Sequence, residues 1–489
     1  MLFNSYEYIL LFLPIVITVY FGLNRAGRET AAKVWLAAAS FFFYGWWKIA
    51  YVPLLFGSIL VNYALGRWMN RIDTVYRNRR KLILLLGLLF DIGLLGYFKY
   101  ADFMIANINA LLRTDIPLLR LVLPLAISFF TFQQIAYLVD TYRGEAKEYS
   151  LLNYALFVSF FPQLIAGPIV HHKEMMGQFV QPDKKRLNYA NLAPGLVIFL
   201  IGLGKKMIIA DTFAVWANAG YADPSVLTLL EGWITSLSYT MQLYFDFSGY
   251  TDMALGAALM LNIQLPLNFN SPYKSVSIQD FWRRWHMTLG RFLRNYVYIP
   301  LGGSRKGEWR TYLNLFLTFL IGGFWHGAGW TFVFWGMLHG VAMVINRLGQ
   351  KIWSQTEGFA KTAFSWFLTF NFVNLAWVFF RAESMADAIL VLKAMFGFNG
   401  VVLPESTAAY LPFLSVYNIK FGGFMMEEYM YSACIMIIAA LVLVLALPNS
   451  VQIKDRFRPN MLTAAIIAGL AVAAILSLSR ISEFLYFNF

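Results

Sequence analysis

Two stretches of sequence decide the fold: Phe281-Trp-Arg-Arg-Trp-His-Met-Thr-Leu289 and Gly322-Gly-Phe-Trp-His-Gly-Ala-Gly329. Each carries one histidine, His286 or His326, among aromatic and apolar neighbours, and the 489-residue chain has only five histidines. Ionisable groups inside a membrane protein are expensive to bury, so they mark functional sites there. We therefore expect the chemistry of this chain in the region that these two stretches delimit.

The composition is that of a membrane protein. Hydrophobic residues make up 59% of the chain and charged residues 13%, against roughly half and about a quarter in soluble domains. Apolar blocks recur from residue 8 to the C-terminus. A crossing needs about 20 apolar residues, so we expect an all-α polytopic membrane protein with about eleven to thirteen transmembrane helices, plus re-entrant and interfacial ones. We expect one integral-membrane domain over residues 1–489, with C-terminal helices in 425–489.

The net charge of +13 has two possible causes, nucleic-acid binding and basic cytoplasmic loops. In a membrane protein the second is the commoner one. The stretch 67–81 is such a loop, with basic residues Arg67, Arg71, Arg77, Arg79, Arg80 and Lys81. We place this loop in the cytoplasm and the N-terminus outside it, and expect no nucleic-acid partner.

Residues 281–296 predict a basic amphipathic helix. At about 100° per residue, Trp285 and the other large apolar side chains fall on one arc. The opposite side carries Arg283, Arg284, Arg291 and Arg294. Such a helix lies at an interface or over a cavity. Guanidinium groups favour bidentate phosphate contact, so we assign this face to an anionic acyl donor or to lipid headgroups.

His326 lies in a glycine-rich apolar stretch. An imidazole can act there as a general base near neutral pH, and the glycines let a substrate come close. The alternative is a histidine hydrogen-bonded to a neighbouring helix; the presence of His286 on a basic helix favours function. For His339 we favour a packing role, and for His171 and His172 a solvated basic loop.

Asp246 and Asp252 lie in apolar surroundings, six residues apart. This spacing puts them on separate faces of a continuous helix, which argues against a paired-carboxylate device, although Ser248-Gly249 suggests a helix break. We expect each to cap a helix end or to pair with an arginine of 283–294. The histidines show no metal-ligand spacing, and no phosphate-binding loop or nucleophile elbow is found. No metal and no bound cofactor are expected.

Three motifs together resemble the signature of the membrane-bound O-acyltransferases (MBOAT). They are Gln279-Asp-Phe-Trp-Arg-Arg-Trp-His-Met-Thr-Leu289, Tyr296-Val-Tyr-Ile-Pro-Leu-Gly-Gly-Ser-Arg-Lys-Gly307 and Gly322-Gly-Phe-Trp-His-Gly327. Flanking motifs resemble the bacterial branch of the family, which O-acetylates alginate, peptidoglycan or cellulose: Leu123-Pro-Leu-Ala-Ile-Ser-Phe-Phe-Thr-Phe-Gln133, Phe161-Pro-Gln-Leu-Ile-Ala-Gly-Pro168, Tyr244-Phe-Asp-Phe-Ser-Gly-Tyr250 and Trp377-Val-Phe-Phe-Arg-Ala-Glu383. The resemblance extends to about residue 396 and is more distant to the teichoic acid D-alanyl transferases. Relatives often carry arginine where this chain has His171.

The resemblance implies a fold and a set of roles. The fold is a multihelical membrane body around a central funnel and tunnel, in the bacterial inner membrane. The donor is acetyl-CoA or another acyl thioester, free or on a carrier protein, and the acceptor is an extracytoplasmic polysaccharide. Relatives of this branch work with a periplasmic acetyltransferase, and membrane lipids surround the chain. We assign catalysis to His326 and His286, and substrate binding to Arg283, Arg284, Arg291, Arg294, Trp285, Trp325 and Asp246.

Two alternatives stand beside the acyltransferase. A transporter or flippase of an acyl group or a lipid-linked substrate also uses broken helices and buried polar groups, but the chain shows no inverted repeat. A scaffold for a periplasmic partner would need neither His286 nor His326.

Overall fold

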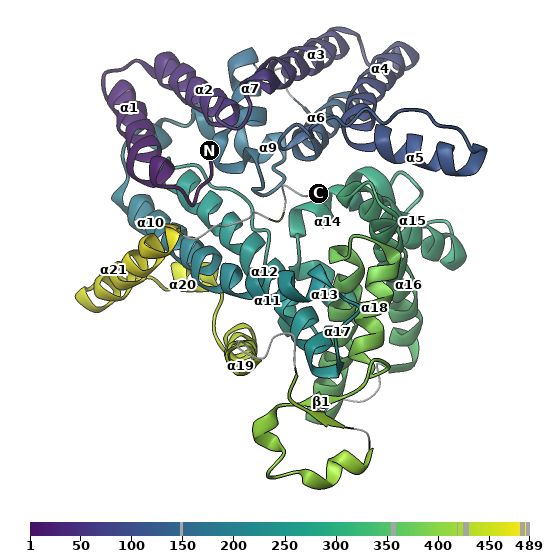
Figure 1. The fold of residues 1–489 in the computed structure, drawn as a ribbon. Helices are drawn as coiled ribbons and strands as arrows, with labels where there is room; N and C mark the ends of the chain where they lie inside the picture. The colour runs from purple at the N-terminus through teal and green to yellow at the C-terminus, as the bar shows by residue number, and fades with distance from the viewer. Residues whose placement is uncertain (147–149, 354–357, 418, 424–429, 480–484, 486–489) are drawn as a thin grey trace.

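The structure is a computed structural model that describes the chain apart from residues 147–149, 354–357, 418, 424–429, 480–484 and 486–489 (Figure 1). Its described part is almost entirely helical. Among the described residues, the regular structure that is not helical is one short parallel pair of strands, β1 (Val402–Leu403) and β2 (Lys420–Phe421); loops such as 261–271 and 299–307 join the helices. The predicted all-α class is confirmed.

The α-helices fall into an N-terminal and a C-terminal set. The first set is α1 (Leu13–Arg25), α2 (Glu29–Gly45), α3 (Val52–Arg71), α4 (Arg77–Leu95), α5 (Ala101–Leu112), α6 (Ile127–Tyr142), α7 (Leu151–Ser159), α8 (Phe161–Leu164), α9 (His172–Met175), α10 (Tyr189–Gly204), α11 (Asp211–Ala222) and α12 (Leu229–Met260). The second set is α13 (Ile278–Arg284), α14 (Met287–Leu293), α15 (Glu308–His326), α16 (Trp330–Trp353), α17 (Phe359–Arg381), α18 (Met385–Met395), α19 (Met430–Ala446), α20 (Ser450–Asp455) and α21 (Met461–Leu476).

Several of these helices are long and apolar enough to cross a membrane. Within the described residues there are six such helical segments: Glu7–Arg25, Ile49–Arg71, Arg77–Leu112, Tyr189–Ala222, Trp330–Gln350 and Phe359–Arg381. Two shorter apolar helices, α19 and α21, follow. The chain is a multi-pass membrane protein, and the larger total of eleven to thirteen crossings stays a prediction.

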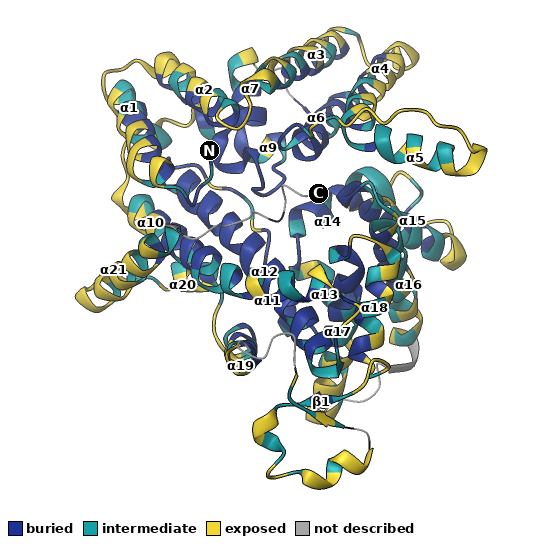
Figure 2. Ribbon diagram, viewed as in Figure 1, coloured by how far each residue is buried: buried dark blue, intermediate teal, exposed yellow. Residues whose placement is uncertain are grey.

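Helix α12 forms the centre of the molecule. It runs unbroken for 32 residues and is buried along nearly all of them (Figures 1 and 2). The break expected at Ser248-Gly249 is therefore wrong. Gly249 serves close packing instead, because a Cβ there would lie 2.7 Å from the carbonyl oxygen of Gly202 on α10.

Two buried ion pairs fasten the segment between α10 and α11 to α12. Lys206 Nζ lies 2.6 Å from Asp246 Oδ1, and Lys205 Nζ lies 2.7 Å from Asp252 Oδ2. The expectation that these carboxylates cap a helix or pair with the arginines of 283–294 is thereby corrected. A buried carboxylate needs a cation in direct contact, and adjacent lysines on the helix packed against α12 supply it.

Helices α15 and α16 form a tightly packed hairpin at the edge of the site. A Cβ on Gly323 would lie 2.5 Å from the carbonyl oxygen of Phe332, and one on Gly336 would lie 2.6 Å from that of Phe319. The two backbones thus touch where neither residue can carry a side chain. This contact fixes the end of α15, where His326 is found.

Candidate active site

His326 is the last residue of α15 and is 5% exposed. Its ring stands edge-on to the rings of Trp335 and Phe380, with both centroids 5.2 Å away. The extended backbone of Gly327 then takes the chain out of the helix. The helix therefore ends directly after this histidine, and the aromatic rings fix the imidazole plane.

The last carbonyl groups of α15, which have no partner within the helix, accept hydrogen bonds from residues of the segment between α4 and α5. Lys99 Nζ donates hydrogen bonds to the carbonyl oxygens of Trp325 (2.7 Å) and His326 (3.0 Å). The hydroxyl of Tyr100 donates to the carbonyl oxygen of Phe324 at 2.7 Å. The last carbonyls of a helix have no partner within it, and a cation there also complements the helix dipole. Lys99 and Tyr100 therefore anchor the turn that carries His326.

His286 lies in a sharp turn between α13 and α14. Its φ of 43° and ψ of 51° place it in the left-handed region, which is sparsely populated for residues with a side chain and is found at functional sites. The single amphipathic helix predicted over 281–296 is thus wrong. The chain breaks at Trp285 and His286, and the break turns the His286 ring into the protein, where it is fully buried.

Asn268 fixes the tautomer of His286. The side-chain oxygen of Asn268 accepts from the backbone N–H and the hydroxyl of Thr288, at 3.3 and 2.9 Å. The same oxygen lies 3.0 Å from His286 Nδ1, so the ring must donate its Nδ1 proton there. Its Nε2 then carries the lone pair and can accept a proton or a hydrogen bond.

The two histidine rings face a common region, with centroids 6.4 Å apart. Within the described residues, neither His326 Nδ1 nor His286 Nε2 has a hydrogen-bond partner, although both atoms are buried. Buried polar atoms are almost always paired, so two unpaired ring nitrogens this close mark a place where a substrate or water completes the bonding. A cavity of about 280 Å³, lined by Lys99, Gly327 and Ala328 among others, opens at the turn that follows His326.

Two findings identify the class of protein. The family model of the membrane-bound O-acyltransferases matches residues 141–386, a range that includes both histidines. Peptidoglycan O-acetyltransferase of Helicobacter pylori is 46% identical to this chain over 520 aligned positions, which cover 100% of the chain and 98% of the relative. The chain belongs to the membrane-bound O-acyltransferase family.

Two further proteins that are similar to this chain also carry names of acyl-transferring enzymes. A protein named probable alginate O-acetylase AlgI, from Pseudomonas aeruginosa, is 40% identical over 85% of this chain and 79% of its own length. The teichoic acid D-alanyltransferase of Bacillus subtilis is more distant, at 30% identity over 53% of this chain and 69% of its own length. The chain is a membrane-bound O-acyltransferase, as its sequence motifs predict.

The arginines assigned to substrate binding in this acyltransferase lie on two helical segments, separated by the break at His286, and differ in their partners. Arg284 pairs with Asp280 on its own helix, at 2.9 Å. Arg291 binds Glu174, with its Nη2 donating at 2.9 Å. Arg283 and Arg294 are exposed and lie on opposite sides of the break at His286. The helical-wheel argument fails because it assumes an unbroken helix.

The aromatic and acidic residues assigned to substrate binding are buried at different places. Trp285 packs between the rings of Phe281 and Trp377, with centroids 5.6 and 5.0 Å away. Asp246 is engaged with Lys206. Trp325 stacks on Phe132 and its centroid is 6.3 Å from that of His286, so of the three it lies next to the histidine pair.

Each of the other three histidines has a bonded ring nitrogen, although Nε2 of His339 has no hydrogen-bond partner among the described residues, like the free nitrogens of His286 and His326. His339 is fully buried and its Nδ1 accepts from Trp282 Nε1 at 3.2 Å, as expected of a packing residue. His171 and His172 correct the expectation of a solvated loop, because His172 is fully buried and both bind Asp140. The helical periodicity of α6 gives no sign that Asp140 faces a loop 31 residues further along.

Three residues of the site were missed in the sequence: Lys99, Asn268 and Thr288. Lys99 carried a usable signal, because a lone lysine inside a long apolar segment is expensive unless it is bonded. Asn268 and Thr288 are short polar residues near a motif, and only the fold shows that they hold His286.

Proposed function

We propose that this chain transfers an acetyl group from a cytoplasmic thioester donor to hydroxyl groups of an extracytoplasmic polysaccharide. The observation that carries the proposal is the buried pair His286 and His326, each with a ring nitrogen unbonded by the described protein. Peptidoglycan is the first acceptor to test, because the relative with 46% identity over nearly its full length is named for it, whereas an alginate O-acetylase that also aligns over its full length is 38% identical. Alginate-like polysaccharide is the second.

His326 acts as the general base. An alcohol has a pKa far above neutral, so it attacks a thioester slowly unless a base removes its proton as the bond forms. The imidazole takes the proton of the acceptor hydroxyl while the oxygen attacks the thioester carbonyl. The carbon–sulfur bond then breaks, the ester forms, and the thiolate leaves and recovers a proton from the imidazolium. His286, whose Nε2 accepts, positions donor or acceptor.

Further parts of the proposal follow the family resemblance. The donor is acetyl-CoA or an acyl group on a carrier protein, and the two exposed arginines, Arg283 and Arg294, meet its anionic part. Trp325 and Trp285 line or support the path of the substrate, and Asp246 supports it through Lys206. A periplasmic acetyltransferase receives or directs the acyl group. The chain forms one domain over residues 1–489 in the inner membrane, with its N-terminus outside the cytoplasm.

The proposal is tested with purified protein in proteoliposomes, radiolabelled acetyl-CoA and either polysaccharide acceptor. His326→Ala should lower turnover by about 10²–10⁴, the range of general-base catalysis, with unchanged insertion and Tm. His286→Ala should lower it less. The matched control is His339→Gln, which keeps an acceptor for Trp282 and should retain turnover. If His326→Ala keeps more than about a tenth of wild-type turnover, its loss falls below that range and the base assignment is wrong.

The same assay separates transfer from transport. A transporter would move label across the bilayer without forming an ester, whereas the family assignment leads us to expect label in the polysaccharide. Label that crosses but stays on its original carrier would refute the transfer chemistry proposed for His326.

A further inference from the structure

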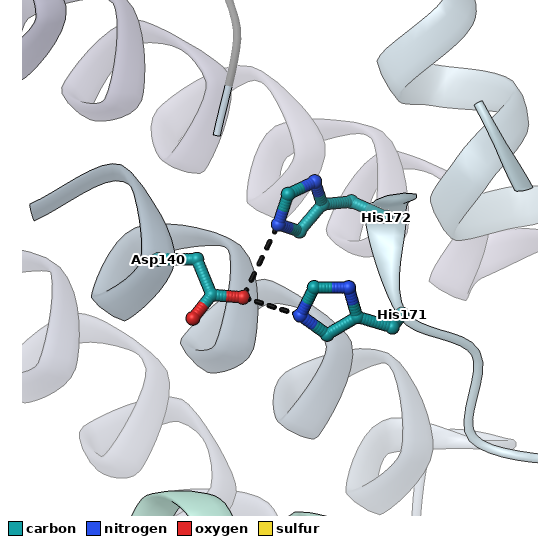
Figure 3. Close-up of side chains that lie close together, drawn as sticks. All are labelled: Asp140, His171 and His172. Atoms are coloured by element: carbon teal, nitrogen blue, oxygen red, sulfur yellow. Dashed lines mark hydrogen bonds and ion pairs between the residues drawn. The ribbon is translucent and has the colours of Figure 1, made fainter. Parts of the chain in front are cut away.

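Asp140, His171 and His172 meet at one point of the structure, away from the histidine pair of the proposed active site. Asp140 lies in the last turn of α6, whereas the two histidines lie at the start of α9 (Figure 3). His171 Nε2 lies 2.5 Å and His172 Nε2 3.1 Å from the same carboxylate oxygen, Asp140 Oδ2. Two imidazole nitrogens thus converge on a single oxygen.

We propose that Asp140, His171 and His172 form a binding site for a divalent transition-metal ion, with Zn²⁺ as the first candidate. Imidazole nitrogen and carboxylate oxygen are the ligands that Zn²⁺ takes in proteins, together with thiolate. The three ligand atoms all lie within 4.8 Å of one another. Ligands held at about 2.0–2.2 Å around a tetrahedral ion lie roughly 3.3 Å apart, so small side-chain adjustments admit the ion.

The surroundings suit a cation that enters from one side. Asp140 and His172 are buried, and His171 is partly exposed, so it leaves an entry path. The hydroxyl of Tyr296 lies 2.8 Å from Asp140 Oδ2 and 3.2 Å from His171 Nε2, beside the fourth position of a tetrahedral site. Arg143 lies 3.7 Å from the other oxygen, Oδ1, which leaves Oδ2 for the ion.

The protonation states of these groups are those that a metal needs. Burial lowers the pKa of His172, so its ring is neutral near pH 7. Burial alone would raise the pKa of Asp140, but hydrogen bonds from His171, His172 and Tyr296 hold it well below its usual range. A neutral imidazole and an ionised carboxylate are the ligating forms.

Metal binding requires a change of tautomer at both histidines, because the Nε2 of each carries the proton that it donates to Asp140 Oδ2. The change at His171 also affects the start of α9. The Nδ1 of His171 accepts from the backbone N–H of Lys173 at 3.3 Å, which leaves the proton on Nε2. When an ion binds Nε2, the proton of the His171 ring moves to Nδ1. Nδ1 then no longer accepts the 3.3 Å hydrogen bond from Lys173, which is lost. The other half of the α9 cap remains, because Glu174 Oε2 accepts from the backbone N–H of His171 at 3.2 Å.

The proposed metal site is connected to His286 through the residues that precede His171. The backbone N–H of Ile169, two residues before His171, donates to Thr288 Oγ1 at 3.0 Å. Thr288 Oγ1 in turn donates to Asn268 Oδ1, the atom that fixes the His286 tautomer. An ion that fastens this loop to α6 therefore also steadies the His286 ring.

The test measures metal rather than turnover. The full chain, purified in detergent with a tag free of histidine, is dialysed against micromolar Zn²⁺ and then metal-free buffer, and its Zn content and Tm are measured. We expect about one Zn²⁺ per chain and a Tm that falls when EDTA removes it, because an ion that binds only the folded state stabilises it.

Two variants and one control locate the ion. His171→Arg keeps a partner for Asp140 but removes a ligand, and His172→Gln removes the other imidazole; both should lose the Zn²⁺ and the Tm response to EDTA. His339→Gln also removes one histidine but should keep both. Wild-type protein without Zn²⁺ and with an unchanged Tm overturns the proposal, and so does Zn²⁺ retained equally by both variants, which places it elsewhere.

Discussion

Replacing Lys99 by methionine should disable the enzyme without unfolding it. Methionine keeps most of the volume of the lysine stem but cannot donate to the carbonyl oxygens of Trp325 and His326, which Lys99 reaches at 2.7 and 3.0 Å. A hydrogen bond to a charged group contributes roughly 1.5–3 kcal/mol, so the two together hold the end of α15 with about 3–6 kcal/mol. The cavity lined by Lys99 and Gly327 admits water to the freed carbonyls, so we take the lower figure.

A loss of about 3 kcal/mol at the turn that carries His326 corresponds to roughly a hundredfold fall in turnover, at about 1.36 kcal/mol per factor of ten. The assay is ester formation in proteoliposomes, with Tm measured on the same preparation. The control is Lys48→Met, which removes an exposed lysine near the ring of Tyr51 and should leave turnover unchanged. Ser128→Ala, which removes only the 3.3 Å contact of Lys99, should have a much smaller effect.

A Lys99→Met protein that retains more than about a third of wild-type turnover would refute the idea that Lys99 positions His326, because that loss is below 1 kcal/mol. A fall in Tm as large as that of a core variant, with turnover per folded molecule preserved, would refute it as well. The ammonium group of Lys99 would then stabilise the folded protein as a whole and would not position His326.

Three more perturbations test other parts of the structure. Asn268→Leu removes the acceptor that fixes the His286 tautomer and should lower turnover about tenfold to a hundredfold, the effect found when a metal-bound histidine loses the group that orients its ring. The apparent donor Michaelis constant should change little, and equal turnover would contradict the tautomer argument. Gly323→Ala puts a methyl group 2.5 Å from the carbonyl oxygen of Phe332 and should destabilise the α15–α16 hairpin by about 1–3 kcal/mol, visible as a lower Tm. The control is Gly349→Ala, where no atom lies within 4 Å of the added methyl group, and its Tm should not fall. In a Cys434→Ala background, Asn78→Cys should resist an impermeant thiol reagent in intact cells if residues 67–81 are cytoplasmic, and labelling would reverse the proposed topology.

The sequence was sufficient where a residue stood out from its neighbours. His326 and His286 were found because ionisable groups are rare in apolar stretches, and the structure brings their rings to 6.4 Å from each other. The glycines around His326 predicted a close approach of another group, and the structure shows close backbone contact between α15 and α16 at Gly323 and Gly336. All-α architecture followed from composition alone.

The sequence was insufficient where the partner lies on a distant element. The wheel drawn over 281–296 could not include the left-handed turn at His286, because no local pattern requires it there. The sequence pattern pairs Asp246 with the arginines of 283–294, whereas its ion-pair partner in the structure is Lys206, on the segment before α11. The basic residues around His171 and His172 predict a solvated loop, because nothing in the sequence indicates that Asp140 of α6 contacts both rings.

The lysine–aspartate pairs between α12 and the segment before α11 also constrain the order of biogenesis. Lys205 and Lys206 would enter lipid as uncompensated cations if their helix were released from the translocon alone, and Asp246 and Asp252 as uncompensated anions. Released together as one hairpin, the two segments neutralise each other before they meet lipid. Delivery of residues 189–260 to the bilayer as one assembled unit avoids both costs, so we expect a pause in synthesis between these helices to be more harmful than one further along.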